Sequence, residues 1–186
     1  MPWDDEDAVV EDVVESLDNP YLCPICNSED CVPAYYGTAD TDVLLVGEEP
    51  GREEIIHGKP FVGPTGKLLQ AELKRYKLRL RSFRLCNLWI HPSNKNDDCF
   101  ERSVKLVLKE AKGKRLVVLI GSDTVKYFTG EKVSKWNGLL VHSPLLNNPY
   151  VMAMVQPATA FRSSIGEMRF ALERLAYYAT LEEEIK

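Results

Sequence analysis

The chain has 186 residues, the size of one domain with a large core, and 45% of its residues are hydrophobic and 27% charged. No apolar run approaches the roughly 18 residues of a membrane span, so membrane-spanning, collagen-like and wholly disordered classes are excluded. The formal net charge of −5 at first argues against a nucleic-acid partner.

The charge is unevenly distributed along the chain. Residues 1–20 contain eight acidic residues and no basic one, and residues 181–186 contain three acidic residues and one lysine. The body between them, residues 21–180, therefore has a net charge of +5, which suits a polyanionic partner. We expect an acidic N-terminal helix or arm over 1–20, one domain over 21–180 and an acidic tail over 181–186.

Hydrophobic periodicity predicts strands and helices that alternate along the chain. The predicted strands are 42–46, 83–90, 115–120 and 150–155. The predicted helices are 4–17, 65–76, 99–112, one that begins at 122 with Ser122 as its cap, and 163–178.

This alternation predicts a three-layer α/β/α sandwich around a mostly parallel, four-stranded central sheet. Ligands of such sheets bind beyond the carboxyl ends of the strands. The loops after Val46, Ile90 and Val155 should therefore converge on one site.

The loop over 47–66 contains five glycines and four glutamates. It lacks both the Walker and the dinucleotide-binding patterns, and its glutamates oppose a bound triphosphate. Paired carboxylates at a strand end suit the activation of a water or the stabilisation of a cationic, sugar-like transition state. The alternative is a solvated acidic turn.

Five cysteines without an apolar signal segment indicate a reducing cytoplasm. Cys23 and Cys26 form a Cys-x2-Cys pair, which is typical of both zinc and iron–sulfur sites.

The stretch Gly47 to Leu69, GEEPGREEIIHGKPFVGPTGKLL, resembles the first motif of the uracil-DNA glycosylase superfamily, particularly its family 4 (iron–sulfur) branch. Asn87 resembles the base-reading asparagine of that superfamily, and QPATAFR over 156–162 resembles its third motif, HPSxxxR. The resemblance extends over 22–178. It implies a DNA glycosylase of base excision repair, which flips uracil out of DNA and hydrolyses its N-glycosidic bond.

The resemblance also implies roles for four residues around the base. Phe61 would stack on uracil, Asn87 would pair with its edge, and Glu54 would lie near C5 and exclude the thymine methyl, with Gly47 completing the site. The structural alternatives are a core aromatic for Phe61 and a strand-end cap for Asn87.

Three residues are the candidates for catalysis. The resemblance makes Glu48 a positioning residue and Glu49 a water activator or oxocarbenium stabiliser. Gln156 stands where the family has a histidine that stabilises charge on uracil O2, and loss of such a donor costs roughly 100- to 1000-fold in rate. The alternatives are therefore an enzyme for another or modified pyrimidine, or a catalytically weak DNA-binding module.

The expected partner is uracil-containing DNA. We expect the protein to bind it as a monomer and to have no membrane partner. Arg162, Ser163, Pro157 and Arg81 are the candidate DNA contacts.

The family's third and fourth cluster cysteines fall on His91 and Cys99, after Cys23 and Cys26. A [4Fe-4S] cluster with one histidine ligand, a Cys3His zinc site and a lost cluster all remain open, with Cys31 and Cys86 as further thiols. Because Cys86 precedes Asn87 on a strand, it should face the packed side of the sheet.

Overall fold

The computed structural model describes residues 22–33, 35–36, 41–92, 97–148, 150–162 and 165–180. The acidic segments 1–20 and 181–186, with the helix predicted over 4–17, lie outside these residues. Within the described ranges, no helix is both long and apolar enough to cross a membrane.

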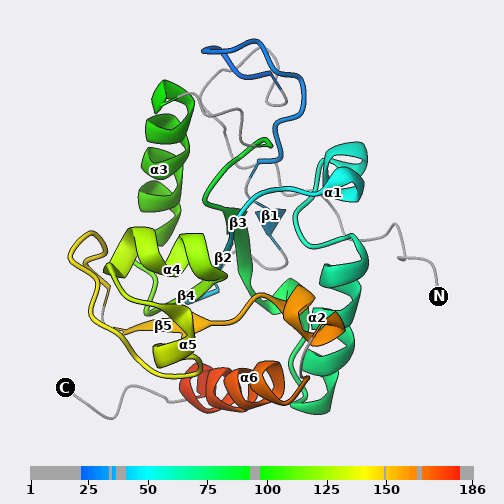
Figure 1. The fold of residues 1–186 in the computed structure, drawn as a ribbon, viewed down its shortest axis with the longest axis vertical. Helices are drawn as coiled ribbons and strands as arrows, with labels where there is room; N and C mark the ends of the chain where they lie inside the picture. Colours follow the sequence, from blue (N-terminus) through cyan, green and yellow to red (C-terminus); the bar gives the residue numbers. More distant parts are fainter. Residues whose placement is uncertain are drawn as a thin grey trace.

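A five-stranded sheet forms the centre of the domain (Figure 1). Its spatial order is β1-β3-β2-β4-β5, and every neighbouring pair is parallel except β1 with β3. The predicted four-stranded parallel sheet is confirmed, and β1 is an additional antiparallel edge strand. The strands are β1 (Tyr35–Tyr36), β2 (Val43–Gly47), β3 (Arg84–Asn87), β4 (Leu116–Ile120) and β5 (Tyr150–Met154).

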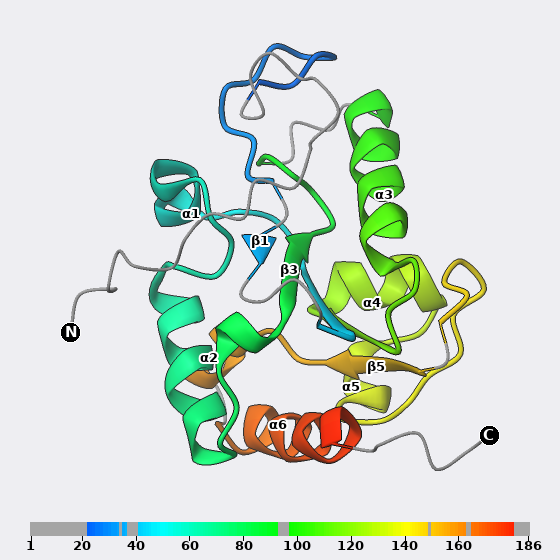
Figure 2. The same ribbon diagram turned by 180° about the vertical axis from the view of Figure 1, so that it is seen from behind.

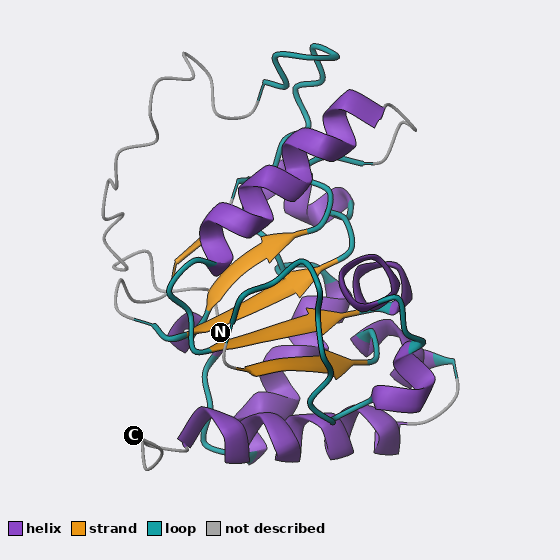
Figure 3. Cartoon of the chain, turned by 90° about the vertical axis from the view of Figure 1, so that its left-hand side faces the viewer, coloured by secondary structure: helices purple, strands orange, loops and turns teal. Residues whose placement is uncertain are grey.

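Helices cover both faces of the sheet (Figures 2 and 3). Helices α2 and α6 pack on one face, and α3 and α4 pack on the other, so the three-layer prediction is confirmed. The helices are α1 (Arg52–His57), α2 (Pro64–Arg75), α3 (Asp97–Ala111), α4 (Ser122–Thr129), α5 (Val133–Trp136) and α6 (Ile165–Thr180), with the 3-10 turns η1 (Leu80–Ser82) and η2 (Pro157–Phe161).

The inner strands are buried on both faces because their side chains alternate between two apolar cores. In β2, Val43 and Leu45 pack toward α2 and α6, whereas Leu44 and Val46 pack toward α3 and α4. Cys86 of β3 belongs to the second core, as predicted. Burial raises the pKa of its thiol, so Cys86 is an inert packing residue.

Strand β3 ends at Asn87, three residues earlier than predicted. The next residues bend away, although the N–H of Leu88 still donates to Gly47 O and that of Trp89 to Glu48 O. The N–H of Val32 donates to Ile90 O, which joins this bend to the N-terminal loop. The shortened strand therefore carries His91 toward that loop.

The parallel register brings the strand ends to one edge of the sheet. Gly47 at the end of β2 pairs with Asn87 at the end of β3. Gly121 follows β4 and Gln156 lies just beyond β5 at the same edge. The fold thus gathers the polar loops where the sequence predicted a ligand site.

Candidate functional site

A pocket of about 500 Å³ opens at this edge of the sheet, large enough for a nucleobase. The loop after β2, Asn87 at the end of β3 and the loop after β5 contribute to it, so the predicted convergence is confirmed for the loops after Val46 and Val155. His91 and Pro92, which follow Ile90, do not line the pocket. Eight predicted site residues line the pocket: Gly47, Glu48, Glu49, Glu54, Phe61, Asn87, Gln156 and Pro157.

Gly47 is the point where Asn87 and Phe61 come together. A Cβ atom at Gly47 would overlap Asn87 Oδ1 and would lie 3.0 Å from Phe61 Cζ. Asn87 is buried and Phe61 is half-buried. The missing side chain therefore lets an amide and an aromatic ring approach each other within one pocket.

The Phe61 backbone has a positive φ of 60°, which is unusual for an aromatic residue. Gly66 fits against the Phe61 carbonyl, where a Cβ atom would collide with it, and Gln70 Nε2 donates to Phe61 O at 3.4 Å. Helix α2 thus holds the backbone of Phe61 in place. Strained backbone of this kind concentrates at functional sites.

Glu48 connects three strand ends through its carboxylate. Its Oε1 accepts a hydrogen bond from the N–H of Asp123 at 3.0 Å, and its Oε2 accepts one from Gln156 Nε2 at 2.9 Å. The predicted Ser122 cap of α4 is wrong: Gly121 is the cap residue, without a side-chain cap bond of its own. Glu48 supplies the acceptor there because it lies beside the N-terminus of α4.

Burial raises the pKa of Glu48, and the nearby Asp123 and Glu49 carboxylates act in the same direction. Glu49 itself is exposed. The two adjacent glutamates therefore differ in environment: Glu48 is half-buried and hydrogen-bonded, while Glu49 faces the solvent side of the pocket.

Glu54 braces the glycine-rich loop from inside the pocket lining. Its Oε1 accepts a hydrogen bond from the N–H of Gly63 at 2.8 Å. Its carboxylate also lies where a Cβ atom at Gly51 would stand, so both glycines make room for it. Glu54 therefore fixes the loop that presents Phe61.

The candidate DNA contacts lie in different places. Arg162 is exposed directly after η2, whose first residue, Pro157, lines the pocket. Ser163 lies outside the described residues. Arg81 is exposed in η1, which precedes β3, so it lies at the amino end of the strand whose carboxyl end carries Asn87.

Phe161 is a residue that the sequence analysis missed. It is the last residue of η2, and its side chain is 64% exposed. The available signal was a large apolar residue between Gln156 and Arg162, outside any strand or helix periodicity.

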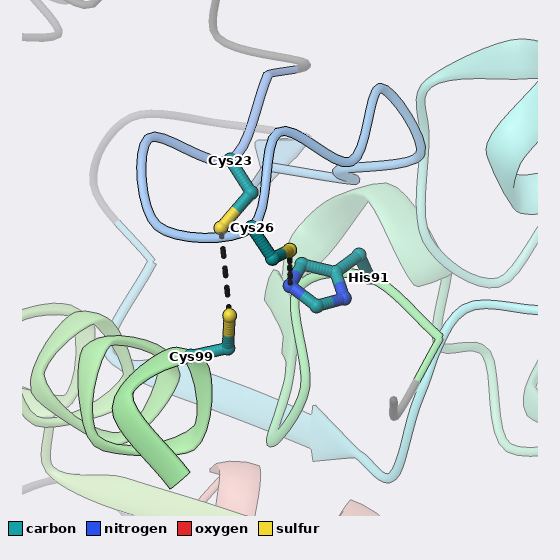
Figure 4. A group of neighbouring side chains, drawn as sticks. All are labelled: Cys23, Cys26, His91 and Cys99. Atoms are coloured by element: carbon teal, nitrogen blue, oxygen red, sulfur yellow. Dashed lines mark hydrogen bonds between the residues drawn. The ribbon is translucent and has the colours of Figure 1, made fainter. Parts of the chain in front are cut away.

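Cys23, Cys26, His91 and Cys99 form a separate group, and their ligand atoms all lie within 4.8 Å of one another (Figure 4). None of the four lines the pocket. The sequence prediction that these four residues assemble is confirmed, and the group could hold a metal ion.

Backbone hydrogen bonds in the N-terminal loop favour the thiolate form of Cys23. Burial opposes ionisation of its thiol, but hydrogen bonds from the backbone N–H groups of Cys26 and Ile25 prevail and lower its pKa to about 6. The left-handed Asn27, with φ of 56°, and the bond from its N–H to Cys23 O shape this turn.

Comparison with known proteins agrees with this geometry. The family described as Uracil DNA glycosylase superfamily matches residues 34–181. The type-4 uracil-DNA glycosylase of Thermotoga maritima is 30% identical over 172 residues, covering 87% of this chain and 88% of the relative. The type-4 uracil-DNA glycosylase of Archaeoglobus fulgidus is 32% identical over 89 residues, covering 47% of this chain and 45% of the relative. The chain therefore belongs to the uracil-DNA glycosylase superfamily, and its similarity is to the type-4 (family 4) branch.

Proposed function

We propose that this chain is a DNA glycosylase of base excision repair, which flips uracil out of DNA and hydrolyses its N-glycosidic bond. The observation that carries the proposal is the meeting of Asn87 and Phe61 over Gly47 inside a nucleobase-sized pocket. The names of the relatives support the same substrate.

Asn87 and Phe61 would select the base. A side-chain amide offers a donor and an acceptor together, which complements O4 and N3–H of uracil. The Phe61 ring would stack on the flipped base, and the braced Glu54 would stand near C5. A pocket bounded by Asn87, Phe61 and Glu54 would accept one base edge and reject others, because a mismatched edge leaves buried polar groups unpaired.

Gln156 and the two glutamates would carry the chemistry. As the glycosidic bond breaks, negative charge develops on uracil O2, and an N–H of Gln156 would donate to it. Glu48 would orient this amide by accepting its other N–H. Glu49 would activate the attacking water or stabilise the cationic sugar.

The residues around the pocket mouth would hold the DNA. Arg162, Ser163 and Pro157 would contact phosphates and sugar beside the flipped nucleotide. Arg81 lies at the opposite end of β3 from the pocket, so any phosphate that it contacts would be far from the flipped nucleotide. The exposed Phe161 ring would fill the gap in the base stack, as apolar wedges do in other DNA-bending proteins.

The five cysteines of the chain are free thiols. This supports a protein that works in the reducing cytoplasm, where thiols are kept available as ligands.

The bond between Gln156 and Glu48 favours a second candidate, a slow enzyme or a DNA-binding module of the same fold. A neutral amide that already donates to a carboxylate is a weaker oxyanion donor than a histidine. A glycosylase for another pyrimidine would share the fold and the pocket.

The test is uracil release by the purified chain from single- and double-stranded oligonucleotides. We expect slow release by the wild type and a rise of roughly 10- to 100-fold in the Gln156→His variant, because an ideal donor is restored. DNA binding without uracil release in either protein would reject the glycosylase proposal in favour of the binding module.

A further inference from the structure

We propose that Cys23, Cys26, His91 and Cys99 bind one tetrahedral divalent ion of the zinc type, in place of the [4Fe-4S] cluster that the family resemblance implies. The four side chains come from three segments that are distant in sequence: the loop 22–33, the bend after β3 and the first turn of α3 (Figure 4). Their side chains point toward one another.

The distances between the ligand atoms fit a single ion. Metal–ligand bonds of about 2.3 Å to sulfur and 2.0 Å to nitrogen give tetrahedral edges of about 3.8 Å between two sulfurs and about 3.5 Å between sulfur and nitrogen. Cys23 Sγ lies 3.8 Å from Cys99 Sγ, and Cys26 Sγ lies 3.7 Å from His91 Nε2. These two opposite edges therefore already have the length that one central ion requires.

The same distances do not fit a four-iron cluster. In a [4Fe-4S] cluster each thiolate binds a different iron, so iron and sulfide ions stand between every pair of ligands. Every ligand pair must then be farther apart than in a mononuclear site. Here all pairs lie within 4.8 Å, and the buried Cys23 and Cys99 nearly touch.

His91 is oriented as a metal ligand by a second hydrogen bond. Its Nδ1 lies 2.9 Å from Pro92 O, and a carbonyl accepts only from a protonated ring nitrogen. This bond places the proton on Nδ1 and leaves the Nε2 lone pair directed at the cysteines. Such a backbone partner on the far ring nitrogen is a regular feature of histidines that bind metals.

Cys31 is close to the group but is not part of it. It is buried, and its Sγ lies near Ser28 O at 4.0 Å rather than among the four ligand atoms. Cys31 therefore provides a matched control for the ligand cysteines.

The site is closed, because four protein ligands complete a tetrahedral ion and leave no position for water or substrate. The ion would join the loop 22–33 and α3 to the bend that begins after Asn87. His91 lies only four residues beyond Asn87, so the ion would fix the position of the base-reading strand end. Its role is structural, and no reaction step passes through it.

The first experiment measures the metal content of the full-length chain. The protein is produced in medium supplied with both iron and zinc and is purified without oxygen, chelators or a metal-binding tag. We expect one zinc per chain, no acid-labile sulfide and no visible absorption, also after anaerobic incubation with excess iron and sulfide. About four irons and four sulfides per chain, or a chain without metal, would overturn the proposal.

Cobalt replacement and variants test the ligands individually. We expect the Co²⁺ protein to show the intense visible bands of a tetrahedral thiolate site. His91→Cys should keep one ion but change those bands, and Cys99→Ser should weaken metal binding at least about 100-fold in a chelator competition. Cys31→Ser should change neither the cobalt bands nor the affinity for the metal. An unchanged cobalt spectrum in His91→Cys would overturn the assignment. These measurements use no DNA, so they stand apart from the proposed glycosylase activity.

Discussion

Gln156 Nε2 donates a hydrogen bond to Glu48 Oε2 at 2.9 Å, which joins the loop after β5 to the loop after β2. The other carboxylate oxygen of Glu48 accepts from the N–H of Asp123 at the start of α4. Glu48 is therefore held by a helix terminus and in turn holds the Gln156 amide, which stands where the family resemblance implies a histidine. This chain of bonds explains how a glutamine can be kept oriented for donation in the pocket.

The first prediction concerns the pH dependence of base release. Glu48 must be ionised to accept both hydrogen bonds, and burial raises its pKa. As the pH falls through this raised pKa, the carboxyl gains a proton and Gln156 loses its anchor, so kcat/KM should fall at a higher pH than for an ordinary glutamate. In Glu48→Gln we expect the rate to be roughly 10- to 100-fold lower and this acid limb to be absent.

Glu53→Gln is the matched control for Glu48. Glu53 also lines the pocket but belongs to α1, where its Oε2 lies 3.7 Å from Nε2 of the exposed His57. Its variant should keep the acid limb. The same limb in Glu48→Gln would show that another group controls the pH profile.

The second prediction concerns the steric role of Gly47. A methyl group in Gly47→Ala would overlap Asn87 Oδ1 and press on the Phe61 ring. Because displacements of about 1 Å at a reacting centre cost about 100-fold, we expect a loss of this size in kcat/KM. Gly51→Ala is the comparison, since its methyl would meet the Glu54 carboxylate but neither Asn87 nor Phe61; an equal loss there would assign the effect to the whole loop.

The third prediction concerns Phe161. If its exposed ring supports the stack after base flipping, Phe161→Ala should lower activity on double-stranded DNA roughly tenfold more than on single-stranded DNA. Phe161→Leu should retain most activity. Phe170→Ala, at an exposed position of α6, should affect activity on double-stranded and single-stranded DNA equally. Equal losses on both substrates would remove Phe161 from the role of a wedge.

The fourth prediction concerns stability. Glu72 of α2 accepts hydrogen bonds from Arg169 Nε at 2.7 Å and Nη2 at 3.0 Å, which join α2 to α6 and lower the pKa of Glu72. Because Glu72→Gln weakens these charge-assisted bonds, we expect its free energy of unfolding at neutral pH to be about 1 to 2 kcal/mol lower than that of the wild type. The solvent-exposed pair of Glu131 with Lys135 is the control, where Glu131→Gln should lower the stability much less than Glu72→Gln does.

The pH dependence of the Glu72 effect has a definite sign. Because the folded-state pKa is depressed, this contribution is present above the ordinary glutamate range and is lost as pH falls through the folded-state pKa. Chemical denaturation of wild type and Glu72→Gln should therefore converge in strongly acidic buffer. A stability difference that persists there would indicate a packing effect instead.

Much of the fold could be predicted because strand and helix patterns are local. The apolar runs that became β2, β4 and β5 are bounded by glycine, proline or polar residues, and their order fixes the parallel sheet and the edge where the loops meet. The side chains of Cys86 and Asn87 were predicted to point to opposite faces of the sheet because consecutive residues of a strand alternate.

Other features depend on contacts between segments that are distant in sequence. The cap of α4 comes from Glu48, 75 residues away from Asp123, so Ser122 was a reasonable but wrong prediction. The positive φ of Phe61 occurs where its backbone packs closely against Gly66 of α2. The close spacing of Cys23, Cys26, His91 and Cys99 exists only after three segments have assembled.

The most direct measurement of the central claim identifies the base that is released. The purified chain is incubated with oligonucleotides that contain uracil, thymine or cytosine at one position, and the free base is identified by mass spectrometry. We expect uracil alone, with release reduced at least about 100-fold in Asn87→Ala, since both hydrogen bonds to the base edge are lost. DNA binding with no released base, or release by Asn87→Ala as fast as by the wild type, would contradict the claim that this chain excises uracil through a pocket read by Asn87.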